Sequence, residues 1–210
     1  MADVTRDDVA FIREVTEAAR NAPLLGGRFL LMWGTLLFVA YLAHWGVVTG
    51  HLGTPSDAAL GVIWGGFGAL GGIGTAIMAP VLNRKPGRNA FGNRVDMAVW
   101  NGAGFALFAY AGTAMLAAAL GRVSYVAVDL IMPVAFGLYG TAFLATAAAS
   151  GQAWLRGFAV GAYVAAAGSV WLSGGPAQYL WGAFAALLVA ALPGFLLLRR
   201  EPPALPRETD

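Results

Sequence analysis

One acidic side chain lies inside an apolar stretch of the sequence, where ionisable groups are rare and are functional candidates by default. Asp129 stands about five residues into a stretch that runs from 124 to 149, and Pro133 follows four positions later. Because proline has no N–H, the carbonyl of residue 129 loses its helical hydrogen-bond partner. Carboxylate and free carbonyl together predict an electronegative site beside a helix kink.

A histidine in an earlier stretch is expected at the same depth as Asp129. His44 lies 15 residues past the start of a stretch that begins at residue 29, or roughly 22 Å along a helix. Tyr125 and Arg122 lie shortly before Asp129 in the sequence. Two interpretations remain open. Either Asp129 snorkels to the surface or pairs with Arg122, or Asp129 and His44 form a contact or water-bridged cluster that relays a proton or a cation.

These side chains must be positioned by membrane-spanning helices. The chain of 210 residues is 59% hydrophobic and only 11% charged, whereas about a quarter of the residues of a soluble domain are charged. Its apolar residues form six blocks, each close to the roughly 20 residues that cross a bilayer as a helix. The sequence therefore predicts an all-α integral membrane bundle of six transmembrane helices, with spans at about 29–49, 58–82, 97–120, 124–149, 153–172 and 177–198.

The basic residues predict the direction of these spans. Of the 13 Lys and Arg residues, all except Arg122 fall in alternate gaps between the blocks. Basic residues are retained on the cytoplasmic side of membrane proteins. We therefore expect a multi-pass protein of the bacterial cytoplasmic (inner) membrane with both termini in the cytoplasm. Tryptophans favour the two membrane interfaces, and they agree with this topology: Trp33, Trp100 and Trp154 fall near predicted inner ends, and Trp45, Trp64, Trp171 and Trp181 near outer ends.

The two ends of the chain lie outside the predicted spans. Residues 1–28 form a cytoplasmic segment, in which 4–22 reads as an amphipathic helix with Phe11 and Val15 on its apolar face. Pro23 and a glycine pair then end this helix before the first span. Residues 199–210 are rich in proline and predict a disordered cytoplasmic tail.

The longest predicted loop, 83–96, is cytoplasmic and basic. Its simplest role is to fix the topology, and an alternative role is to bind anionic lipid headgroups. The candidate lipid contacts are Arg84, Lys85, Arg88 and Arg94. Polar side chains near the inner ends of the spans predict ordinary interfacial hydrogen bonding, and they are Asp96, Asn101, Thr146, Ser150, Gln152 and Arg156.

Glycines at helical spacing predict where helices approach closely, since helix association in lipid depends on close backbone contact. The second block has four such glycines and the fifth block has a pair. We expect them to pack within the chain, while a homodimer face or a backbone-lined path for a small solute are the alternatives. The residues are Gly61, Gly65, Gly68, Gly72, Gly157 and Gly161.

Several kinds of membrane enzyme and cofactor site are disfavoured by composition. The chain has no cysteine, which excludes thiolate metal sites and disulfides. Its sole lysine, Lys85, lies in a loop, and its two histidines, His44 and His51, both lie towards the outer side. A retinal Schiff base within the spans is therefore excluded, and a haem between two axial histidines is not expected. We expect no enzymatic activity, no cofactor, no metal site and no nucleic-acid partner.

Two short patterns carry a resemblance to known proteins. They are Ile12-Arg13-Glu14 with Glu17, followed by Gly27 and Gly34, and then Pro133 followed by Tyr139-Gly140 in the fourth block. With these patterns the chain resembles an uncharacterised family of small bacterial inner-membrane proteins. The resemblance implies a six-span fold and supplies no activity.

Three functions fit these observations. The first is a non-enzymatic membrane subunit that binds or regulates a partner, which is either a second copy of the chain or another membrane protein. The alternative is a small-solute or ion transporter or channel with a polar site near Asp129. The third is a lipid- or quinone-binding membrane protein that uses a groove between helices.

Overall fold

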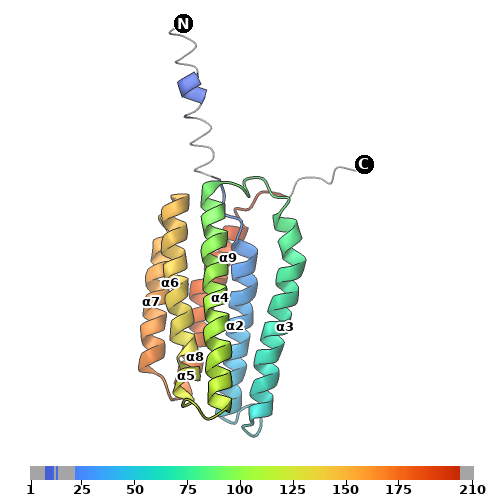
Figure 1. The fold of residues 1–210 in the computed structure, drawn as a ribbon, viewed down its shortest axis with the longest axis vertical. Helices are drawn as coiled ribbons and strands as arrows, with labels where there is room; N and C mark the ends of the chain where they lie inside the picture. Colours follow the sequence, from blue (N-terminus) through green and yellow to red (C-terminus); the bar gives the residue numbers. More distant parts are fainter. Residues whose placement is uncertain (1–7, 12, 14–21, 204–210) are drawn as a thin grey trace.

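The computed structural model describes residues 8–11, 13 and 22–203, and every regular element in this part of the chain is helical (Figure 1). Most of the amphipathic helix predicted at 4–22 lies outside the described residues. Within this range the structure describes only residues 8–11, 13 and 22, and of these 8–11 and 13 are helical. The remaining elements are α2 (Gly27–Val48), α3 (Asp57–Leu82), α4 (Phe91–Ala119), α5 (Val126–Asp129), α6 (Ile131–Ser150), α7 (Leu155–Trp171), α8 (Ala177–Ala186), the π-helical segment η1 (Leu187–Ala191) and α9 (Leu192–Leu198).

Five helical stretches of the described chain are long and apolar enough to cross a bilayer. They coincide with five of the six predicted blocks, and the other block forms α7, which has 17 residues. An all-helical bundle with several candidate membrane spans is therefore confirmed. The five stretches are Gly27–Val48, Asp57–Leu82, Phe91–Ala119, Val126–Ser150 and Ala177–Leu198.

The predicted loop 83–96 is shorter in the structure, because α4 begins at Phe91. The helix extends over these residues because their polar groups have partners. The backbone N–H of Arg94 donates to the carbonyl of Ala90 at 3.0 Å, and the side chains of Asn93 and Asp96 are buried against neighbouring segments. The prediction, which relied on the polar character of these residues, therefore placed the start of this helix too late in the sequence.

Helices α2 and α6 are the central elements of the bundle (Figure 1). α2 packs against α3 and against α8, η1 and α9, while α6 packs against α4 and α7. A core cluster that includes Tyr41, Met132 and Phe136 joins α2 to α6. Helices α3 and α4 therefore lie at the periphery of the bundle.

The connections alternate between the two ends of the bundle (Figure 1). One end carries the start of α2, the α3–α4 and α6–α7 connections and the end of α9; it also holds Arg28, Lys85 and Arg200, and is called the basic end here. The opposite end, called the far end, carries the turns that follow α2, α4 and α7. This up-and-down order places Asp129 towards the far end and Asp96 towards the basic end.

The closest helix contact joins α2 to η1 and α9. A Cβ atom on Gly34 would overlap the backbone of Ala190 and Ala191, and one on Gly194 would overlap the backbone of Leu31. Gly27, two turns before Gly34, lies equally close to the end of α9. Close backbone approach of this kind is a main source of helix association in lipid.

Candidate functional site

Asp129 lies where the fourth predicted span is interrupted. Helix α5 ends at Asp129 and α6 begins at Ile131, two residues before Pro133. The Asp129 carbonyl, which proline leaves without a helical donor, accepts a hydrogen bond from Nε2 of Gln178 at 2.9 Å. Gln178 belongs to α8 and is buried, so the broken helix is fixed to the last span.

The Asp129 carboxylate is held by the next residue of α8. The Tyr179 hydroxyl donates to Oδ1 of Asp129 at 2.9 Å. The ring of Tyr179 stacks on the His44 imidazole, with ring centroids 3.7 Å apart and an angle of 17° between the planes. His44 and Asp129 are thus linked through Tyr179, and no direct hydrogen bond joins the two side chains within the described residues.

A fourth residue fixes the orientation of His44. Nε1 of Trp64 donates to Nδ1 of His44 at 3.0 Å. An indole N–H is a donor only, so Nδ1 must accept and the proton of the neutral imidazole lies on Nε2. Trp64, His44, Tyr179 and Asp129, contributed by α3, α2, α8 and α5, are called the polar row below.

Two predicted members of this site are not part of the polar row. Tyr125 is 72% exposed and does not contact the Asp129 carboxylate through any hydrogen bond found in the described residues. Arg122 lies in the exposed turn before α5, and within the described chain no ion pair joins it to Asp129. The expected pairing of Asp129 with Arg122 is therefore wrong, because Tyr179 supplies the partner.

The residues that sequence reasoning missed are Trp64, Gln178 and Tyr179. Gln178 and Tyr179 stand in the first turn of α8, at the level at which Asp129 ends α5. Counting depth from the far end along the last block would have brought them to Asp129. Trp64 looked like an interfacial anchor, and only its contact with His44 shows another role.

The chemistry open to the polar row follows from its single carboxylate. Within the described residues no basic side chain pairs with Asp129, and no group of three or more His, Asp or Glu side chains is placed to hold a metal ion. Divalent cations prefer six or more oxygen ligands, often including several carboxylates. One half-buried carboxylate with a tyrosine hydroxyl instead suits a proton or a monovalent cation.

The predicted packing glycines do not pack within the chain. Within 4 Å of a Cβ atom placed on Gly61, Gly65, Gly68, Gly72 or Gly157, no other part of the described chain is present. A Cβ atom on the remaining glycine, Gly161, would make only an ordinary contact with Val189. In the same helix as the first four, Gly71 and Gly74 pack instead, against Trp33 and Met32. The expectation of intrachain packing is therefore wrong for five of the six positions. Helix α3 turns a different face to α2, and Gly157 lies on an uncovered face of α7.

Three of the polar side chains predicted near the inner ends of the spans, Asp96, Thr146 and Ser150, are buried and hydrogen-bonded at the basic end. Oγ1 of Thr146 donates to Oδ1 of Asp96 at 2.8 Å, which joins α6 to α4. The Ser150 hydroxyl donates to the Thr146 carbonyl at 2.7 Å. The first bond joins two packed helices and the second lies within α6. Thr146 is thus the hydrogen-bond partner of the Asp96 carboxylate.

A buried ion cluster closes the basic end. Glu201, with its side chain 1% exposed, accepts from Arg28 and from Lys85, each at 2.6 Å. Lys85 also donates to the Pro202 carbonyl at 2.8 Å. Residues 201–203, expected in a disordered tail, are thus fixed to the α3–α4 connection, and 204–210 lie outside the described residues.

The ion cluster changes the set of candidate lipid contacts. Lys85 is buried in it and is not available to a lipid headgroup, so this part of the prediction is wrong. Arg84 and Arg94 are exposed, and Arg88 is half-buried.

The polar row, the ion cluster and the exposed glycines are the features from which a function must be argued. Comparison of the chain with protein-family models, with curated proteins and with solved structures finds no match.

Proposed function

We propose that the protein is a non-enzymatic subunit of the bacterial cytoplasmic membrane, with six spans, both termini in the cytoplasm and a second copy of itself as its partner. Helix α7 is about 25 Å long at 1.5 Å per residue, at the short end of the range for a transmembrane helix. If α7 is counted as a span, all the Lys and Arg residues except Arg122 fall on the same side of the membrane. That distribution supports the proposed orientation.

The uncovered glycine face of α3 carries this proposal. Only 6% of the most apolar part of α3 is buried in the bundle, against 56% for the last span. At 3.6 residues per turn, the four glycines fall within about 60° of the helix circumference, and all four are open. Large apolar side chains that suit lipid contact occupy another face, at Val62, Leu70, Ile73 and Ile77.

The expected occupant of this face is the same face of a second copy. A glycine surface gives lipid chains little to pack against, whereas it lets another helix backbone approach closely. A small-residue face is complementary to itself, as a two-fold interface requires.

Cross-linking of single cysteines tests the interface without background, because the chain has no cysteine of its own. We expect Ala76→Cys, beside the glycine face, to form disulfide-linked dimers in lipid nanodiscs or native membranes. The matched control is Leu70→Cys on the other face, which should cross-link at least tenfold more slowly. In the background of Gly65→Ile with Gly68→Ile, the Ala76→Cys dimer should be lost. Equal cross-linking from both faces, or no effect of the isoleucines, would contradict the interface.

A second function, binding of a monovalent cation, is favoured by the polar row. Asp129 lies at an interrupted helix, a place where transporters bind ions. Its carboxylate has a hydroxyl donor and, among the described residues, no basic partner. A cation that enters from the far end would complete the charge balance of this half-buried group.

Thermal unfolding in nanodiscs tests cation binding. With Na⁺, K⁺ or NH₄⁺ in turn replacing choline at constant ionic strength, one ion at about ten times its Kd should raise the Tm by about 3–5 °C. Asp129→Asn should remove this shift, and Asp57→Asn, a change at an exposed acid in the first turn of α3, should keep it. A Tm that none of the three ions changes would rule out this second function.

A further inference from the structure

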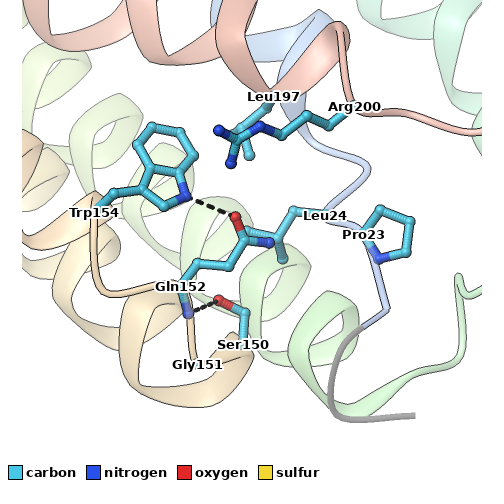
Figure 2. A pocket seen from close by; sticks show the side chains of 8 residues that line it. All are labelled: Pro23, Leu24, Ser150, Gly151, Gln152, Trp154, Leu197 and Arg200. Atoms are coloured by element: carbon cyan, nitrogen blue, oxygen red, sulfur yellow. Dashed lines mark hydrogen bonds between the residues drawn. The ribbon is translucent and has the colours of Figure 1, made fainter. Parts of the chain in front are cut away.

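A cavity of about 310 Å³ opens at the basic end, away from both the polar row and the glycine face. It lies between the α6–α7 turn, the end of α9 and the segment that leads into α2 (Figure 2). Its walls combine the buried apolar side chains of Leu24 and Leu197 with the polar side chains of Gln152 and Arg200. The cavity is therefore apolar on one side and carries a positive charge on another.

The local sequence holds Gln152 in place. Helix α6 ends at Ser150 and is capped by Gly151, whose φ of 70° is a left-handed conformation that favours glycine. The turn that follows lets the backbone N–H of Gln152 donate to the Ser150 hydroxyl at 3.3 Å. Nε1 of Trp154 donates to Oε1 of Gln152 at 2.9 Å. Since the amide oxygen is occupied, Gln152 offers its N–H₂ group as a donor.

Arg200 is held beside the same space by an aromatic ring. Its guanidinium carbon lies 5.1 Å from the centroid of the Trp154 ring, which is within the range of a cation–π interaction. Glu201, the nearest acid in sequence, is occupied by Arg28 and Lys85. In Figure 2 the Arg200 guanidinium lies beside the Trp154 ring, and the Gln152 amide, whose oxygen is bonded to Trp154, lies below it on the same side of the cavity.

The donor set of the cavity is matched by one class of ligand. No acidic side chain is among the residues that line it, and Arg200 is the charged side chain of the lining. A guanidinium presents several N–H groups in a fixed plane, which suits the oxygens of a phosphate. We propose that this cavity binds a phosphate-bearing anion, delivered as the headgroup of an anionic phospholipid or as free phosphate, with Arg200 and Gln152 as its donors.

Binding is tested with the full-length protein in nanodiscs of phosphatidylcholine. Short-chain phosphatidylglycerol, short-chain phosphatidylcholine and inorganic phosphate are added in separate arms, and the Tm and the bound lipid seen by native mass spectrometry are recorded. We expect phosphatidylglycerol to bind and to raise the Tm, and Arg200→Gln to weaken its binding at least tenfold. The matched control is Arg199→Gln, which changes the neighbouring exposed arginine and should leave binding within twofold of the wild type.

A second variant guards against a loss of binding that comes from misfolding. Gln152→Leu keeps a side chain of similar size and should weaken binding several-fold while the Tm without ligand stays near that of the wild type. Stabilisation by phosphatidylglycerol alone assigns the site to a lipid headgroup, and equal stabilisation by inorganic phosphate assigns it to the free ion. Equal binding of phosphatidylcholine and phosphatidylglycerol, or an equal loss in Arg199→Gln and Arg200→Gln, would overturn the proposal.

Discussion

Gly34→Ala should lower the free energy of unfolding by about 3 kcal/mol, near the upper end of the usual cost of overpacking. The added methyl group would overlap the backbone of Ala190 and Ala191, which cannot turn aside as a flexible side chain can. To relieve the overlap, α2 would have to move away from η1 and α9. Thermal unfolding in detergent should show a Tm lower by about 6–12 °C for a chain of this size.

Gly157→Ala is the matched control for this substitution. Gly157 also lies within a helix, but the space around it is open. The same methyl group should leave the Tm unchanged or raise it slightly, because alanine is favoured over glycine in a helix by about 1 kcal/mol. Equal Tm values for Gly34→Ala and Gly157→Ala would mean that the contact between α2 and η1 does not hold the bundle together.

This pair of glycines shows what spacing in a sequence can and cannot predict. Glycines four apart, as in α3, show that a helix is able to approach another closely, but the spacing does not say which helix. Gly27 and Gly34 are seven apart and were not among the predicted packing glycines, yet α9 contacts the backbone of α2 at Gly27 and η1 contacts it at Gly34. The pairing depends on which faces the whole bundle leaves free, and no local pattern contains that information.

Other parts of the fold follow from local chemistry and were predictable. Apolar blocks of sufficient length gave the helices, and Pro133 gave the break beside Asp129. The helix dimensions brought His44 to the level of Asp129, although Tyr179 lies between them. Glu201 was not predictable as a buried residue, because its partners Arg28 and Lys85 are more than a hundred residues away in the sequence.

Asn93 is the residue on which the largest number of segments at the basic end converge. Oδ1 of its side chain accepts from the backbone N–H of Leu25 at 3.0 Å. Nδ2 donates to the carbonyls of Pro23 and Gly87, both at 2.9 Å. The side chain is 2% exposed, and it ties the start of α2 and the α3–α4 connection to α4 through one buried and two partly buried bonds.

Asn93→Ala should therefore destabilise the protein by about 3 kcal/mol, since each buried backbone group left without a partner costs about 1–3 kcal/mol and some will recover a water. Asn93→Asp should destabilise the protein at least as much as alanine does, because it keeps the acceptor for Leu25 but places a buried carboxylate oxygen against the Pro23 and Gly87 carbonyls. Asn89→Ala, at an exposed position four residues earlier, is the control and should leave the Tm within 1 °C of the wild type, about the shift that 0.3 kcal/mol produces. Hydrogen exchange separates this effect from general loosening: the Leu25 amide should lose protection in Asn93→Ala and keep it in Asn93→Asp. Equal protection of that amide in both variants would show that the side chain of Asn93 does not hold the connector.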